Sequence, residues 1–345
     1  MTQFRKACAA AKRFWRYWKA KKHRSIYVGI ADVCNAKCYY CQKGYDNLQQ
    51  VRSTKKPFME VGFFEKLVRH CKAAHFLDET GVLGLYSWNE SFLHPELTKI
   101  IDVGTREHCL MSLASNGSIR PKLPENFDAS AIGNISFSLC GFSQASYDKI
   151  HQLDFHQIRS NIEWMVRAFR QHGFFGFFLL RFHIYQFNVS EIEPARRWAK
   201  SLGMQFAPYY AYINDPQKSW QYLQQTLPVE YLTRVSKDLF MGYHLYRSKK
   251  VMNGCDRIVV AWPDVEGDCK VCCMNNTSIG SIFDFSSPEE MMRAKQSICQ
   301  QCLATFDFNM WDEINDDDWK KRRAGKLSFS YVSQFLKTCF LKGRQ

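Results

Sequence analysis

Three cysteines follow a short apolar run in the arrangement C-x3-C-x2-C, at Cys34, Cys38 and Cys41. The run, Ile26 to Ile30, has the composition of a buried strand. Three thiolates in one turn can hold one face of an iron–sulfur cluster, whereas a closed cluster takes four. The next cysteine is Cys71, so one iron would keep a position open to a ligand from outside the protein. An open position is typical of a reactive metal site.

A zinc site is the alternative for this motif. It requires a fourth nitrogen or sulfur ligand close in the sequence, and the nearest downstream candidate is His70. The usual zinc patterns contain paired C-x2-C units. The spacing of these three cysteines therefore favours the iron–sulfur cluster.

The cysteine content also bears on the cellular compartment. The 345-residue chain has 14 cysteines, several of them in short clusters, and this distribution favours metal binding over disulfides. The sequence shows no secretory signal, and no apolar stretch approaches the ~20 residues needed to span a bilayer. We therefore expect a cytoplasmic protein, at most peripherally attached to a membrane.

Short apolar runs alternate with longer amphipathic ones from Ser25 to about Tyr210. This alternation predicts parallel strands connected by helices, with the chemistry at the carboxyl ends of the strands. The expected strands are Ile26–Ile30, Val82–Tyr86, Leu110–Ala114, Ile135–Leu139, Phe177–His183 and Gln205–Tyr209. The expected helices are Val61–Ala74, Pro95–Arg106, Gln157–Gln171 and Ser190–Leu202, the last with Ser190 as N-cap and Glu193 completing a capping box.

The cysteine motif, with aromatic Tyr40 directly before its last cysteine, resembles the signature of the radical S-adenosylmethionine (SAM) enzymes. The resemblance implies an α/β fold, a partial (β/α)6 TIM-like barrel. It also implies that Cys34, Cys38 and Cys41 bind a [4Fe–4S] cluster whose fourth iron is chelated by SAM. In that family an electron donor such as flavodoxin or ferredoxin reduces the cluster, and SAM cleavage yields a 5′-deoxyadenosyl radical that abstracts hydrogen from the substrate.

Later segments extend the resemblance. Where the family has a Gly-Glu-Pro-like segment that binds the SAM amino group, this chain has Trp88-Asn89-Glu90, and Glu90 matches the acid. Asn89 takes the place of a glycine with positive φ, for which asparagine is the usual second choice. The ends of the next three strands imply further contacts with SAM, from Ser115, Asn116, Ser138 and Arg181.

Cys140 stands at the end of the fourth expected strand, where the family often has aspartate. A thiol at the mouth of such a barrel can return a hydrogen atom to a substrate radical, as in radical epimerases. The alternative is a small buried apolar residue, which is the usual state of a free cysteine.

The carboxyl-terminal cysteines resemble the SPASM/twitch extension of the same family, in its short version with a single auxiliary cluster. The resemblance implies a small cysteine-rich, SPASM-like domain with an auxiliary [4Fe–4S] cluster held by Cys255, Cys272, Cys299 and Cys302. Cys269 or Cys273 can substitute for one of these ligands. A zinc ribbon is the alternative, because paired cysteines also suit zinc.

We expect five segments: a basic amphipathic N-terminal helix (1–24), the barrel (25–210), a helical bridge broken at Pro216 and Pro228 (211–250), the auxiliary-cluster domain (251–310) and a C-terminal tail (311–345). The first 24 residues carry nine Lys or Arg and no acid, in a chain of net charge +14. A basic helix with tryptophans can contact an anionic membrane surface or an acidic partner. The alternative is a helix that packs on the barrel through its aromatic face.

These features together predict a radical SAM oxidoreductase that acts on a peptide or a small molecule. If an auxiliary cluster accepts the remaining electron, the outcome is net oxidation, such as dehydrogenation or crosslinking; if Cys140 returns hydrogen, it is epimerisation. The alternative of another class is a non-catalytic metal protein that binds nucleic acid. It is disfavoured because the basic excess is concentrated at one terminus and is not interleaved with aromatic residues along a groove.

Overall fold

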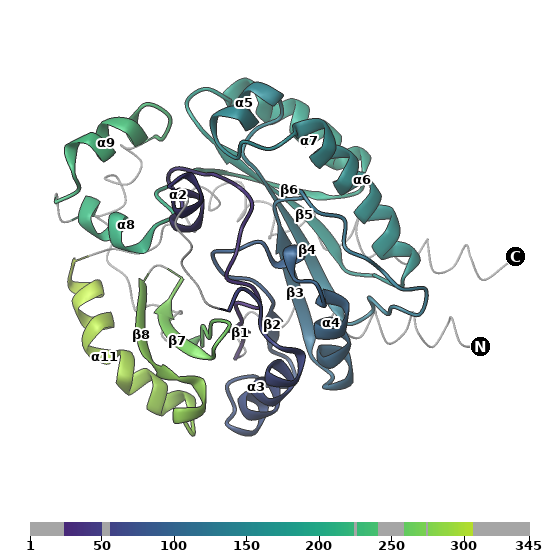
Figure 1. The fold of residues 1–345 in the computed structure, drawn as a ribbon, viewed down its shortest axis with the longest axis vertical. Coiled ribbons are helices and arrows are strands. Elements are labelled where there is room, and N and C mark those ends of the chain that lie inside the picture. Colours follow the sequence, from purple (N-terminus) through teal and green to yellow (C-terminus); the bar gives the residue numbers. More distant parts are fainter. Residues whose placement is uncertain (1–23, 50–55, 224–225, 241–258, 274, 306–345) are drawn as a thin grey trace, which may run out of the picture.

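The computed structural model describes residues 24–49, 56–223, 226–240, 259–273 and 275–305. Six parallel strands form one sheet in sequence order (Figure 1). This confirms the predicted partial barrel and all six expected strands, with shifted ends. The strands are β1 (Ile26–Tyr27), β2 (Val82–Gly84), β3 (Leu110–Ser115), β4 (Ile132–Leu139), β5 (Phe177–Ile184) and β6 (Gln205–Tyr210).

The four expected helices connect these strands as α3 (Val61–Ala73), α4 (Leu97–Arg106), α6 (Phe155–Gln171) and α7 (Ile192–Ser201). A short helix that the sequence did not predict, α5 (Gln144–Lys149), lies between β4 and α6. Helix α6 begins two residues earlier than expected, because the Asp154 side chain caps it by accepting the N–H of Gln157 at 3.0 Å.

The predicted capping box at Ser190 is wrong. Ser190 lies inside a 3₁₀ turn, η3 (Val189–Glu191), and α7 follows with Glu191 at its N-cap. The side chain of Asn188 sets this turn, since it accepts the N–H of Tyr185 at 2.8 Å and donates to the carbonyl oxygen of His183 at 2.9 Å. Buried bonds from outside the helix therefore decide where α7 starts.

The two faces of β5 differ in burial. Along β5 the side chains alternate between buried and half-buried, as a strand with one covered face requires. The buried set includes Phe178, which contacts Phe174 at 4.6 Å between ring centroids and lies 5.4 Å from the guanidinium of Arg170 on α6. The half-buried set includes Arg181 and His183, which face the interior of the barrel together with their neighbours on β4 and β6.

The carboxyl-terminal unit is built on the free edge of β1. It contains an antiparallel hairpin, β7 (Asp268–Cys272) and β8 (Asn275–Ser281), a 3₁₀ turn η6 (Ile282–Asp284) and helix α11 (Pro288–Thr305). Before the hairpin, the carbonyl oxygen of Ala261 accepts the N–H of Tyr27 at 3.0 Å, and that of Pro263 accepts the N–H of Gly29 at 2.9 Å. These bonds pair backbone N–H groups along the outer edge of β1, where the sheet has no further strand.

Three further helices lie near one another to one side of the sheet (Figure 1): α2 (Gln42–Leu48), α8 (Pro216–Leu223) and α9 (Val229–Ser236). Pro216 is the first residue of α8 and Pro228 is the N-cap of α9, so both prolines mark helix starts. The expected N-terminal helix, apart from Arg24, and the C-terminal tail lie outside the described residues. Within the described part of the chain, no helix is both long and apolar enough to cross a membrane.

Candidate metal centre

The three motif cysteines lie on the loop that leaves the carboxyl end of β1. Burial raises the pKa of all three thiols, that of Cys34 to about 12. The thiols are also close enough to act on one another, because Cys41 and Cys34 each raise the pKa of Cys38 further. A buried thiol of this kind loses its proton readily only when a metal binds the sulfur and the proton is released to solvent. The donor set, one buried and two half-buried cysteines on one loop, fits an iron–sulfur cluster.

Two residues that sequence reasoning missed shape this loop. The side-chain amide of Asn47, on α2, donates to the carbonyl oxygens of Cys34 at 2.7 Å and Ala36 at 2.8 Å. Gly44, in the first turn of α2, packs against the backbone of Cys38 with no room for a Cβ atom. Neither residue belongs to a recognisable motif, and only the tertiary contact reveals its role.

The cysteine loop is hydrogen-bonded to the end of β3. Asn35, which directly follows Cys34, accepts the side-chain N–H of Asn116 at 2.9 Å and donates to the hydroxyl of Ser118, also at 2.9 Å. Asn116 was expected near SAM on the strength of its place in the sequence. The structure therefore brings this predicted residue to the cysteine loop.

Glu90 lies at the same place, fully enclosed and 1% exposed. One carboxylate oxygen accepts the backbone N–H of Phe92 at 3.0 Å, and the other accepts that of Asn116 at 2.6 Å. Burial raises the pKa of Glu90 to about 7, although these two amides and the Ser115 hydroxyl oppose the shift. The negative charge of the Glu90 carboxylate also raises the pKa of the Cys34 thiol.

Asn89 does not adopt the glycine-like conformation that the sequence suggested. The non-glycine residues with positive φ in the described ranges are His75, His108 and Gln152, and Asn89 is not among them. Its side chain instead donates to the carbonyl oxygen of Ala31, at the start of the cysteine loop. That bond holds the segment around Asn89 in place without a left-handed residue. The neighbouring side chain of Trp88 is half-buried.

Ser138 and Arg181 are register partners on β4 and β5 and face the barrel interior together. One step further along, His183 pairs with Tyr209 of β6, and the Tyr209 hydroxyl is hydrogen-bonded to Nε2 of His183. Burial lowers the pKa of His183 to about 3, and the nearby His151 and Arg181 lower it further. The interior thus carries a cation beside a neutral imidazole, a pairing that sequence reasoning missed.

Tyr40 and Cys140 are both enclosed beside Cys38. The Tyr40 hydroxyl accepts a hydrogen bond from the hydroxyl of Tyr185, and the two ring centroids are 5.8 Å apart. Cys140 is fully buried, and its thiol contacts the carbonyl oxygen of Ser146 at 3.9 Å. Its proximity raises the pKa of both Cys38 and Tyr40. The geometry is that of a packed core cysteine.

No protein-family model and no curated protein sequence matches this chain. Among solved structures, anSMEcpe with bound AdoMet (SAM) and the Cp18Cys peptide superposes with a TM-score of 0.52, at 15% identity over 92% of this chain and 95% of that chain. Its form with AdoMet alone gives 0.51, at 14% identity over 91% and 99%. Both are radical SAM enzymes. The chain shares the fold of these two structures. SuiB from Streptococcus suis, bound to SAM, gives a TM-score of 0.47 at 10% identity over 85% of this chain and 68% of that chain.

The candidate auxiliary ligands lie beyond the barrel. Side chains of β7 alternate, so that Cys269 is fully buried while Cys272 is half-buried on the other face. Burial raises the pKa of Cys269 to about 12, and Cys269 in turn raises the pKa of buried Cys71. Cys273, in the turn after β7, and Cys299, on α11, are half-buried. Cys302 also lies on α11, but its side chain falls outside the described residues, as does all of Cys255.

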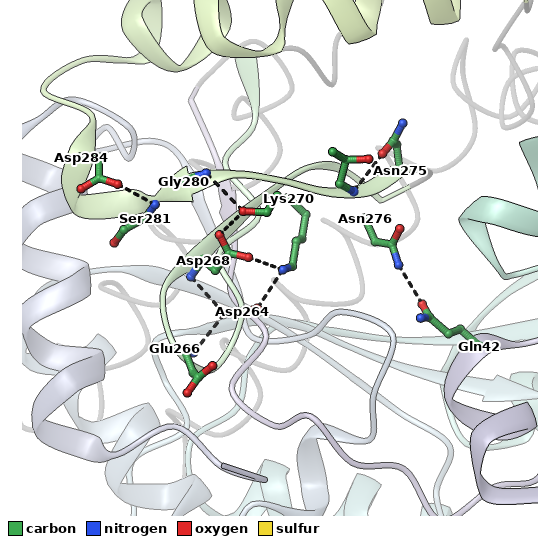
Figure 2. Close-up of polar contacts among 12 residues, drawn as sticks. Gln42, Asp264, Glu266, Asp268, Lys270, Asn275, Asn276, Gly280, Ser281 and Asp284 are labelled. Carbon is green, nitrogen blue, oxygen red and sulfur yellow. Dashed lines mark hydrogen bonds and ion pairs between the residues drawn. The ribbon is translucent and has the colours of Figure 1, made fainter. Parts of the chain in front are cut away.

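The turn before β7 is organised by Asp264. Its carboxylate accepts the backbone N–H groups of Glu266 and Asp268, both at 3.0 Å, and forms an ion pair with Lys270 at 3.1 Å (Figure 2). Gly267 completes the turn with φ +81°, a conformation that suits glycine. At the far end of the hairpin, Asn276 points toward α2 and donates to Gln42 at 3.2 Å (Figure 2). The hairpin therefore contacts the helix that follows the cysteine motif.

Among the side chains that the structure describes, no three His, Cys, Asp or Glu residues surround a point in the way that a single bound ion requires. The cysteines of an iron–sulfur cluster need not surround a single point, because each thiolate binds a different iron of the cluster.

Proposed function

We propose that this chain is a radical SAM enzyme whose SAM-binding [4Fe–4S] cluster is held by Cys34, Cys38 and Cys41. One observation carries the proposal: the three-cysteine loop lies at the carboxyl end of a six-stranded parallel sheet and is hydrogen-bonded to the end of β3 through Asn35 and Asn116. The likeness to anSMEcpe supports the fold on which the site is built.

The neighbouring residues suit the functional groups of SAM. Glu90 keeps lone pairs on both oxygens after accepting two backbone amides, so it can accept hydrogen bonds from an ammonium group. Ser138 and Arg181, side by side on the interior face, suit a carboxylate. When bound and reduced, the cluster would supply the electron that cleaves SAM.

We further propose net oxidation as the outcome, with an auxiliary cluster held by Cys255, Cys272, Cys299 and Cys302. The half-buried position of Cys272 and Cys299 supports this role, as does the contact of the hairpin with α2. The enclosure of Cys140 within the core disfavours the epimerase alternative, which needs a thiol that reaches the substrate.

A peptide is the substrate class we favour, because anSMEcpe was solved with the Cp18Cys peptide bound. A small molecule is the alternative. The proposal includes a cytoplasmic location and an electron donor such as flavodoxin or ferredoxin. A contact between the basic N-terminal segment and a membrane surface or an acidic partner also stays a proposal.

The decisive experiment measures iron and SAM cleavage in anaerobically reconstituted protein. We expect about eight irons per chain for two clusters, and slow formation of 5′-deoxyadenosine after reduction. Replacing Cys34, Cys38 and Cys41 together by alanine should remove about four irons and all cleavage. Cys109→Ala is the matched control, because Cys109 is a buried cysteine outside both motifs. Stoichiometric zinc without iron, or no cleavage by the reduced protein, would refute the proposal.

A further inference from the structure

The segment that follows β6 reaches back to the last cysteine of the loop at Asn214. Asn214 forms a parallel bridge with Cys41, and its carbonyl oxygen accepts the backbone N–H of Gln42 at 3.2 Å. Its side-chain amide donates from Nδ2 to the sulfur of Cys41 at 3.5 Å. One residue thus fixes the backbone at Cys41 and also directs an N–H group at its sulfur.

Asn214 is held firmly in this position. Its neighbours Ile213 and Asp215 are 0% and 6% exposed. The carboxylate of Asp215 accepts the N–H of Lys218 at 3.0 Å, and the hydroxyl of Ser219 donates to the carbonyl oxygen of Ile213 at 2.7 Å. These bonds secure the turn into α8, so the Asn214 amide is presented from an ordered segment.

The donors that face the three sulfurs differ in origin. Backbone amides of Ala36 and Asn35 face the sulfur of Cys34, the Tyr40 hydroxyl faces that of Cys38, and backbone amides of Lys43 and Gly44 face that of Cys41. All of these donors belong to the cysteine loop or to the first turn of α2, which follows it. Asn214 comes from the opposite end of the barrel sequence, 173 residues away from Cys41.

An N–H bond to a cluster thiolate has a defined electronic effect. It withdraws negative charge from the sulfur, and the more negative, reduced cluster gains most from that withdrawal. Groups beyond the ligands therefore tune a metal site as well as orient it. Loss of the donor is expected to make reduction harder.

We propose that Asn214 is a positioning residue for the SAM cluster, which orients Cys41 and raises the reduction potential of the cluster through its hydrogen bond to the Cys41 sulfur. The inference rests on the proposed cluster and extends that site to the segment beyond β6. It assigns a role to a residue that lies outside every cysteine motif.

The test is a redox titration of reconstituted full-length protein, following the electron paramagnetic resonance signal that changes when SAM is added. Asn214→Ala and Asn214→Asp should both shift the midpoint potential to more negative values. The shift should be larger for aspartate, because its carboxylate adds negative charge beside the sulfur. Asn276→Ala is the matched control: it removes the bond to Gln42 without touching a sulfur, so the potential should stay at the wild-type value.

A second measurement needs no substitution. Asparagine labelled with ¹⁵N in its side-chain amide should give a hyperfine coupling to the reduced cluster of the wild-type protein. Absence of that coupling, or unchanged potentials in both Asn214 variants at wild-type iron content, would overturn the inference. Wild-type protein that binds no iron would contradict the proposed function instead, so the two failures are distinguishable.

Discussion

A Cβ atom on Gly44 would lie 2.5 Å from the amide nitrogen of Cys38 and 2.9 Å from its Cα. Both atoms are backbone, so neither can rotate out of the way as a side chain can. The first turn of α2 and the cysteine loop therefore approach each other as closely as glycine permits. This close approach sets the path of the loop between its second and third cysteines.

The first prediction is that Gly44→Ala displaces the loop. Overpacking of this kind costs about 1–3 kcal/mol, and we expect most of the iron of the SAM cluster to be lost with it. Gly62→Ala is the matched control, because Gly62 also lies in the first turn of a helix but has nothing within 4 Å of its Cβ position. The control should keep its iron and unfold at a slightly higher temperature. Full iron content in Gly44→Ala would show that the loop tolerates the methyl group.

The second prediction concerns the pH dependence of SAM binding. Because the pKa of Glu90 is about 7, its carboxylate becomes protonated as the pH falls through neutrality and loses its attraction for the SAM ammonium group. Affinity measured by calorimetry should therefore be highest above pH 7 and decline below it. Glu90→Gln should bind SAM roughly ten- to a hundredfold more weakly and without this pH dependence. A wild-type decline that persists in Glu90→Gln would remove Glu90 from the site.

The third prediction is that Glu90 makes the free energy of unfolding of the metal-free protein depend on pH. The folded pKa of Glu90 lies above the ordinary value of 4.5, so the folded chain binds more protons than the unfolded chain between those values. Its contribution to stability is fully present below pH 4.5 and is lost as the pH rises through about 7. Denaturant midpoints of Glu90→Gln should lack this component. Equal pH slopes in both proteins would contradict the buried, raised acid.

The barrel could be predicted from the sequence because short apolar runs alternate with amphipathic segments along it, and because the cysteine motif carries its own spacing. Helix α2 was missed, since Gln42–Leu48 is mostly polar and lacks an amphipathic pattern. The roles of Gly44, Asn47 and Asn214 depend on contacts between segments, which no local pattern encodes. Ser190 shows the opposite case. Its sequence context has the residues of a capping box, but the hydrogen bonds of the Asn188 side chain place Ser190 in a 3₁₀ turn before the helix.

The fourth prediction separates the cysteines of β7. Cys269→Ala should keep both clusters and cost about 1 kcal/mol of stability, because it truncates a fully buried side chain. Cys272→Ala should remove the auxiliary cluster, about four irons, and stop product formation while 5′-deoxyadenosine still forms. Iron analysis and thermal unfolding of the two variants decide the matter. Iron loss in Cys269→Ala alone would reverse the assignment.

The last prediction separates oxidation from epimerisation through Cys140. Its thiol is fully buried against the Ser146 carbonyl oxygen, so we expect Cys140→Ala to leave product formation nearly unchanged. Turnover in deuterated water with an identified substrate supplies the independent measurement. Under net oxidation the product is two daltons lighter than the substrate and carries no solvent deuterium at the reacting carbon, because no hydrogen atom returns there. Solvent deuterium at that carbon, lost in Cys140→Ala, would establish the thiol as a hydrogen donor and reverse the assignment.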